Sequence, residues 1–149
     1  MNMHVKNSAK LTLWINRTIA LALAVMVFLL PALLEHYTDL WSFTQAERTG
    51  IAVAYYICLL LIMPALWNID KLLRNILARN VFIRDNVTRI RRICWYCAGV
   101  GVVCISAAHL FFPLYFLAVI MFFLALVVNV IKDVMAAAVS IREENDLTI

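Results

Sequence analysis

Four cysteines are the residues of this sequence with the widest range of possible chemistry. Cys94 and Cys97 form a Cys-x-x-Cys pair, Cys104 follows in the same apolar stretch, and Cys58 stands apart. Such a pair can be a redox centre or half of a metal site, but the first needs a thioredoxin-like context and the second needs another pair of ligands. The sequence offers neither context, so we interpret the thiols as packing residues and predict that they are dispensable.

Two other polar side chains, His109 and Asn129, interrupt long apolar runs. Polar residues inside a membrane segment are functional-site candidates by default. A single histidine without nearby carboxylates is a poor proton relay, and a single asparagine commonly bonds to a neighbouring helix. The sequence also carries no nucleophile–base pair, phosphate-binding glycine loop, metal motif or cofactor fingerprint. We therefore predict that the protein is not an enzyme and needs no cofactor or metal.

The composition is that of an integral membrane protein. Of the 149 residues, 65% are hydrophobic and 15% are charged, against about 45–50% apolar and about 25% charged residues in soluble domains. The length predicts one domain, residues 1–149. The net charge of +4 does not indicate nucleic-acid binding here, because Lys and Arg in a membrane protein first report topology.

Four apolar segments are long enough to cross a hydrocarbon core of about 30 Å, which needs about 20 helical residues. Continuous apolar runs lack the alternation of barrel strands, so the expected fold is all-α. We predict a membrane four-helix bundle of two helical hairpins, in which only Pro113 separates the last two spans. The predicted spans are residues 13–34, 51–67, 93–112 and 114–131.

The basic residues give the orientation. Twelve of the 13 Lys and Arg residues lie before or near the start of the first span, between the second and third spans, or after the fourth, and only Arg48 lies in the loop between the first two spans. Basic residues favour the cytoplasmic side of a membrane. We therefore place both termini, the loop 68–92 and the tail 132–149 in the cytoplasm, with the chain in a bacterial inner membrane.

The loop 68–92 contains an amphipathic pattern that predicts a separate helix. Asp70 and the basic residues beside it are expected to face away from the apolar stripe, and Asp85 or Asn86 could cap the helix that follows. The stripe is either embedded among lipid headgroups or docks a partner. Its apolar residues are Ile69, Leu72, Leu73, Ile76 and Leu77.

The tail ends in "REENDLTI". Val134, Ala138 and Ile141 have helical spacing, so the fourth span should continue for two or three turns. The tail is acidic where the loop is basic, which leaves two interpretations. It folds back on the loop of its own chain, with Leu147 and Ile149 adding apolar contacts, or it is offered to another protein.

Two stretches, "NVFIRDNVTRIRRICWYC" and "SIREENDLTI", carry a resemblance to a known family. They resemble domain-of-unknown-function family 2975, which consists of small bacterial four-span membrane proteins. The resemblance is expected to cover essentially the whole chain, although Cys94 stands where the family often has a small polar residue. The matching residues are Phe82, Asn86, Ile90, Arg91, Arg92, Ile93, Trp95 and residues 143–149.

The resemblance implies no established activity, but family members are often genomic companions of small helix-turn-helix transcription regulators. It therefore favours a membrane-bound regulatory or interaction partner of a cytoplasmic protein. The expected partner-binding residues are Phe82, Asn86, Arg91, Arg92, Glu143, Glu144, Asn145, Asp146, Leu147 and Ile149. The alternative is a small transporter or channel formed by a homo-oligomer in the lipid bilayer, for which His109, Asn129 and the small-residue face of the third span are the evidence.

Overall fold

Four long helices make up the described part of the chain. The computed structural model describes residues 3–41, 43–78 and 80–147, and the side chains of residues 7–36, 43–78 and 80–145. All four helices are long and apolar enough to cross a membrane. The protein is therefore a multi-pass membrane protein with the predicted all-α fold. The helices are α1 (Met3–Trp41), α2 (Gln45–Leu77), α3 (Arg84–Ala107) and α4 (Pro113–Leu147).

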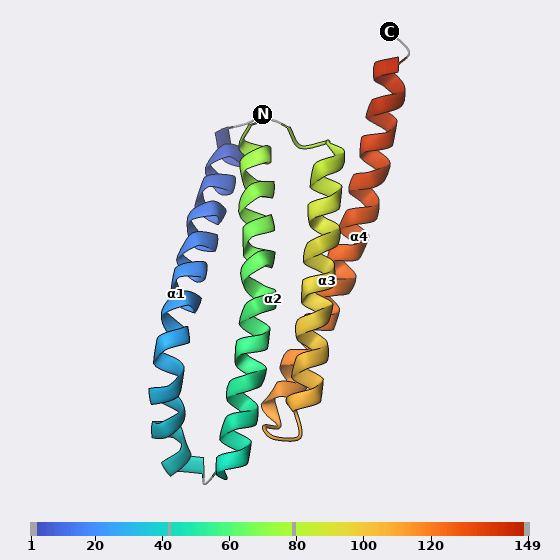
Figure 1. Cartoon of the computed structure of the whole chain (residues 1–149). Helices are drawn as coiled ribbons and strands as arrows, with labels where there is room; N and C mark the ends of the chain where they lie inside the picture. The colour runs from blue at the N-terminus through green and yellow to red at the C-terminus, as the bar shows by residue number, and fades with distance from the viewer. Residues whose placement is uncertain (1–2, 42, 79, 148–149) are drawn as a thin grey trace.

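The helices pack in the order of the sequence, α1 on α2, α2 on α3 and α3 on α4 (Figure 1). Within the described residues, no close backbone approach joins α1 to α3 or α4. The helices α1, α2 and α3 stand side by side in Figure 1, and α4 crosses behind α3 and continues beyond its start. Each helix thus depends mainly on its neighbours in the sequence for its position.

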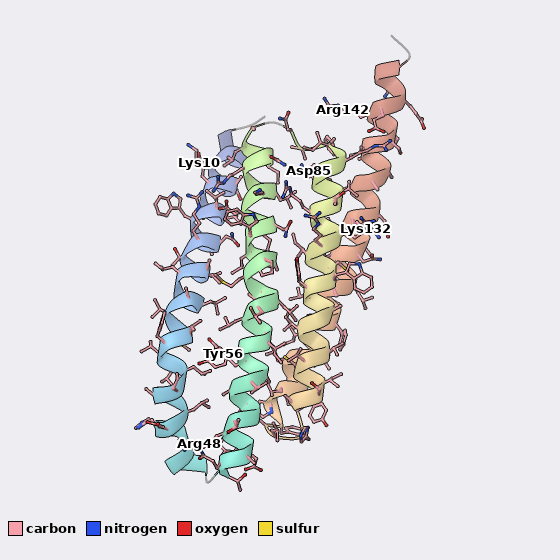
Figure 2. The ribbon with its side chains drawn as sticks, in the orientation of Figure 1. Lys10, Arg48, Tyr56, Asp85, Lys132 and Arg142 are labelled. Atoms are coloured by element: carbon pink, nitrogen blue, oxygen red, sulfur yellow. The ribbon has the colours of Figure 1, made fainter. Side chains whose placement is uncertain are left out.

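One end of the molecule collects the start of α1, the end of α2, the start of α3 and the end of α4 (Figure 1). We call it the basic end, because the segments rich in Lys and Arg meet there. Figure 2 shows Lys10, Asp85 and Arg142 toward this end and Arg48 at the opposite end. The polar contacts that join the helices concentrate at the basic end, as described below.

The helices α1 and α2 extend past the predicted span boundaries, so most of the expected loop over residues 35–50 is helical. The start of α2 is fixed by a capping box: the Thr44 hydroxyl accepts a hydrogen bond from the Glu47 amide at 3.4 Å, and the Glu47 carboxylate accepts one from the Thr44 amide at 2.8 Å. This Thr-x-x-Glu spacing satisfies two otherwise unpaired backbone donors. Charged residues beside an apolar run therefore marked a helix start here rather than a loop.

The amphipathic segment of the loop is helical, but it continues α2 without a break to Leu77 and is not a separate helix. Asp70 does not face away from the packed side of α2, because only 8% of its surface is exposed. The next helix begins at Arg84, and its N-cap residue, Ile83, makes no side-chain cap bond. The prediction that Asp85 or Asn86 caps this helix is wrong, because the Asn86 side chain bonds to the preceding connector instead.

The turn between α3 and α4 is longer than predicted. The helix α3 ends at Ala107 and α4 begins at Pro113, where a missing backbone N–H costs nothing. Four of the five connecting residues, 108–112, are apolar, so composition gave little sign that the helix had ended. The Phe111 ring packs edge-on against Phe43 at a centroid distance of 6.1 Å, which explains an apolar turn at this end.

The interface of α3 and α4 contains the buried core. Val100, Cys104 and Ala118 form one buried cluster. A Cβ atom placed on Gly101 would lie 3.1 Å from the Phe122 ring of α4, so any larger residue would crowd this close approach. The small-residue face of the third span is therefore used inside the chain, as small residues between membrane helices predict.

Candidate functional site

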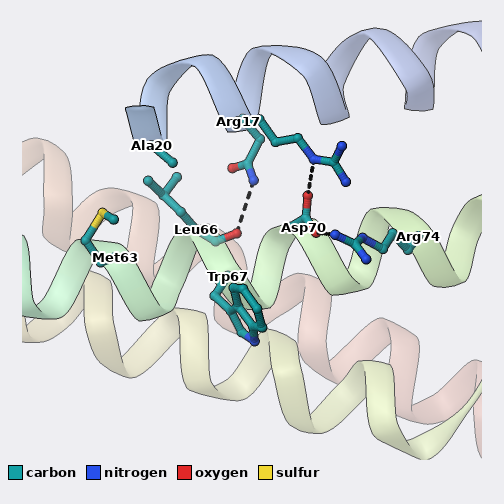
Figure 3. A pocket seen from close by; sticks show the side chains of 8 residues that line it. Arg17, Ala20, Met63, Leu66, Trp67, Asp70 and Arg74 are labelled. Carbon is teal, nitrogen blue, oxygen red and sulfur yellow. Dashed lines mark hydrogen bonds and ion pairs between the residues drawn. The ribbon is translucent and has the colours of Figure 1, made fainter. Parts of the chain in front are cut away.

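The first polar cluster of the basic end joins α1 to α2 around Asp70. The Asp70 carboxylate accepts from Arg17 Nε of α1 at 3.0 Å and from Arg74 Nη2, one turn further along α2, at 2.7 Å (Figure 3). The Asp70 side chain is 11% exposed, whereas those of Arg17 and Arg74 are 47% and 58% exposed. The carboxylate therefore holds two cations whose outer edges remain in contact with solvent.

Two buried asparagines support this cluster. Asn16 Nδ2 donates to the Leu66 carbonyl across the α1–α2 interface at 3.1 Å, and Asn68 Nδ2 donates to the Pro64 carbonyl at 2.8 Å. Beside them lies a pocket of about 250 Å³ with Met63 and Trp67 in its wall. These bonds satisfy side chains that would otherwise be costly to bury.

The second cluster fixes the connector between α2 and α3, and its centre is Asn86, whose exposure is 0%. The Asn86 Nδ2 atom donates to the carbonyls of Asn80 at 2.9 Å and Val81 at 2.7 Å. Its Oδ1 atom accepts from Asn75 Nδ2 of α2 at 2.6 Å. One side chain therefore ties the end of α2, the connector and the first turn of α3 together.

The third cluster joins α3 to α4 near their ends. Arg84 Nε and Nη2 donate to the two carboxylate oxygens of Glu143 at 2.8 and 2.6 Å. Glu143 lies beyond the apolar span, and the hydrogen bonds from Arg84 lower the pKa of its carboxyl group. Below this ion pair, a groove of about 290 Å³ runs between the helices, with Val87 and Val139 among its lining residues. Two parallel bonds of this kind fix orientation as well as distance.

Beyond Ile131, α4 continues for about four turns to Leu147. We call residues 132–147 the arm. Val139 is buried against α3, whereas Val134 and Ile141 are 64% and 59% exposed. The predicted apolar stripe therefore faces away from the rest of the chain, and a different face of the arm contacts α3.

The three clusters offer fixed charge and hydrogen-bonding groups. In the part of the chain that the structure describes, no three His, Cys, Asp or Glu side chains gather as a metal site would require. The Lys71 ammonium lies 5.3 Å from the centre of the Trp67 ring, an arrangement typical of the boundary between lipid and water. These features are consistent with a binding surface at the basic end.

The comparison with known proteins agrees with the sequence motifs. The family model described as "Protein of unknown function (DUF2975)" matches residues 40–149, about three quarters of the chain. The chain belongs to this family. The expected coverage of essentially the whole chain is wrong, because nearly all of α1 precedes the match. No curated protein and no solved structure matches this DUF2975 member.

The family motif residues of this DUF2975 chain occupy different environments. Phe82 is 44% exposed, and Arg91 and Arg92 are exposed on the first half of α3. Asn86 is fully buried, so its side chain is not presented to a partner. Its place in the motif is instead explained by the shape of the connector.

The motif residues of the tail lie on or beyond the arm. Glu143 is paired with Arg84, and Glu144 and Asn145 are exposed. The backbone of Asp146 and Leu147 belongs to α4, but their side chains, and the whole of Ile149, lie outside the described residues. The expected docking of Leu147 and Ile149 on the loop therefore stays a prediction. The tail does not fold back as far as Leu147, because it continues as helix.

The two intramembrane candidates are far apart in the fold. His109 is exposed in the turn after α3, at the end opposite to the basic end. Asn129 is exposed on α4 and accepts a hydrogen bond from Lys132 at 3.0 Å. The cysteines occupy packed positions, with Cys104 in the core and Cys94 Sγ donating to the Ala125 carbonyl at 3.3 Å.

Sequence reasoning missed the Asp70 cluster. The available signal was Arg17, which follows Asn16 inside the apolar residues that open the first predicted span. A charge at that depth is costly unless it is paired, so a partner on another helix should have been sought. The one acidic residue in the amphipathic segment, Asp70, was the natural choice.

Proposed function

We propose that this protein is a membrane-bound regulatory or interaction partner of a cytoplasmic protein, placed in a bacterial inner membrane with its basic end in the cytoplasm. The exposed stripe of the arm carries the proposal. At 35 residues, α4 is about 52 Å long, against about 30 Å of hydrocarbon. The surplus lies at the basic end, where lipid does not cover apolar side chains such as Ile141.

The charged residues around the apolar stripe indicate which kind of partner would bind. The start of α3 exposes Arg91 and Arg92, and the arm beside it exposes Glu144 and Asn145. A partner helix with an apolar stripe flanked by charges of both signs would complement this pair of helices. The family resemblance favours a small helix-turn-helix transcription regulator as the partner class.

The alternative of an oligomeric transporter draws less support from the packing of the chain than the interaction proposal does. Small residues of α3 pack inside the same chain, Gly101 against α4 and Gly99 against α2. His109 and Asn129 line neither the pocket beside Asp70 nor the groove below the Arg84–Glu143 ion pair. We therefore retain the interaction proposal alone.

The test is co-purification of cytoplasmic proteins with the full chain in lipid nanodiscs. We expect Ile141→Asp to lose the partner, because it places a charge in the apolar stripe. The matched control is Ser140→Asp, which adds the same charge one residue away, on the side of the arm that borders the groove. Equal recovery of partners by the full chain, by Ile141→Asp and by a chain lacking the last eight residues would contradict the proposal.

The orientation has its own test. Reporter fusions at Asn7, Arg84 and the C-terminus should report a cytoplasmic location, and a fusion at Asp39 should report the other side. A fusion at Arg84 that reports the outside would exclude a cytoplasmic basic end.

A further inference from the structure

A cavity of about 220 Å³ lies among the helices, in their apolar region and away from the basic end. All four helices contribute to its wall, from Leu23 of α1 to Met121 of α4. Side chains in the wall are almost all hydrocarbon or thiol. The volume exceeds the roughly 150 Å³ of an engineered apolar cavity that binds benzene. A small organic molecule therefore fits.

Tyr55 in the wall of this cavity supplies a second and independent observation. Its hydroxyl oxygen is buried, and it has no hydrogen-bond partner among the described residues. The hydroxyl of the next residue, Tyr56, donates to the Val27 carbonyl at 3.3 Å. A buried hydroxyl without a partner is costly, and natural structures seldom keep one without a reason. Tyr55 thus lines the cavity and carries a buried donor that has no partner among the described residues.

We propose that this cavity binds a small lipophilic molecule that carries a hydrogen-bond acceptor such as a carbonyl oxygen, and that the Tyr55 hydroxyl donates to that oxygen. The apolar wall takes the hydrocarbon part of the ligand, and the single donor selects its polar atom. This division is the usual one in small-molecule sites, where many apolar contacts give affinity and a few polar groups fix orientation. The ligand enters from the surrounding lipid, which already dissolves molecules of this class.

A purely hydrocarbon occupant, such as part of a lipid chain, is the competing explanation. It would fill the volume but leave the Tyr55 hydroxyl unpaired. Two probes of nearly the same shape separate these cases. Acetophenone carries a carbonyl oxygen, whereas ethylbenzene lacks one. The structure predicts tighter binding of acetophenone than of ethylbenzene, and it assigns the difference to one hydrogen bond.

The readout is the methyl resonance of Met121, which lines the cavity, in the full chain labelled with ¹³C-methyl methionine and held in nanodiscs. Met63 lines the separate pocket beside Asp70 and serves as the internal control. We expect acetophenone to shift the Met121 signal saturably while the Met63 signal stays in place. Tyr55→Phe should weaken acetophenone binding about two- to tenfold, the range for one net hydrogen bond, and should leave ethylbenzene binding unchanged.

Two further variants test whether the effect is specific to the Tyr55 hydroxyl and to this cavity. Tyr56→Phe removes the neighbouring hydroxyl, which does not line the cavity, and should leave binding of both probes unchanged. Ala54→Leu narrows the cavity from its own wall and should weaken both probes. The proposal is overturned by non-saturable shifts for both probes, or by equal affinities of acetophenone for the wild type and Tyr55→Phe in samples whose methionine spectra show an intact fold. A stronger effect of Tyr56→Phe than of Tyr55→Phe would overturn it as well.

Discussion

Replacement of Asn86 by Asp should open the connector between α2 and α3, although it preserves the size and shape of the side chain. In the native chain, the Asn86 amide nitrogen donates to the carbonyls of Asn80 and Val81 at 2.9 and 2.7 Å. In the variant, an oxygen replaces this nitrogen and faces two carbonyl oxygens at those distances. Two attractive contacts thereby become repulsive, at a side chain with no exposed surface.

The magnitude follows from the number of bonds. The two lost hydrogen bonds remove about 1 kcal/mol each, and the Asn80 carbonyl, left without this donor, costs about 1–3 kcal/mol more. The Val81 carbonyl still accepts a hydrogen bond from the Ile83 amide at 3.2 Å. The bond from Asn75 at 2.6 Å survives, because a carboxylate still accepts it. We expect Asn86→Asp to lower the free energy of unfolding by about 3–5 kcal/mol at neutral pH. Asn86→Ala should lose a similar amount, about 3–5 kcal/mol, since it also deletes the bond from Asn75 but adds no repulsive charge.

The assay combines detergent-induced unfolding, followed by circular dichroism, with limited trypsin digestion of the connector in nanodiscs. Asn80→Asp is the matched control, because it makes the same chemical change at an exposed side chain and keeps the backbone carbonyl that Asn86 uses. The reasoning is refuted if Asn86→Asp unfolds within about 0.5 kcal/mol of Asn80→Asp, a difference typical of surface substitutions. Equal cleavage of the two connectors would refute it too.

Three other contacts give testable expectations. Gly101→Val should reduce stability by about 1–3 kcal/mol, as overpacking does, in a thermal melt, because its side chain would strike the facing aromatic ring of α4. Asp70→Asn should reduce it by about 1–2 kcal/mol, between the values for exposed and buried ion pairs, and a double-mutant cycle with Arg17→Gln should show coupling. The lowered pKa of Glu143 means that its bond to Arg84 is fully present above the usual glutamate pKa of about 4.3 and is lost as the pH falls through the lowered value. The distribution of distances between nitroxide labels on α3 and on the arm should therefore broaden only in that acid range. Glu143→Gln should remove this pH dependence.

The sequence predicted the number and type of the helices, because an apolar run of sufficient length has few other solutions in a membrane. It predicted their ends poorly. Polar residues, Glu35 and Asn68, ended the apolar runs, but the helices continue there to Trp41 and Leu77. Mostly apolar residues continued over the turn at residues 108–112, where the helix has already ended. The composition of a segment reports whether lipid or water surrounds it, whereas capping contacts and turns determine where a helix ends.

The candidate site was predictable in its location and less so in its contacts. Clustering of Lys and Arg marked the basic end, and the acidic tail suggested the ion pair that the structure shows between Arg84 and Glu143. The buried role of Asn86 was not predictable, since its two backbone acceptors depend on the path of the connector. The bond from Arg17 to Asp70 joins residues 53 positions apart and depends on the relative rotation of two helices, which a single sequence does not specify.

The three polar clusters differ in how easily a bound partner could compete for their contacts. This difference predicts which part of the fold would move first. Asn86 is sealed from solvent, and the Asp70 carboxylate is nearly so. The Arg84 and Glu143 side chains are 82% and 42% exposed, so their ion pair is open to competition from a charged partner. A protein that binds the arm can therefore exchange this one contact for its own while the other two hold. If the proposed partner binds the arm, movement should begin at the arm and stop at the connector.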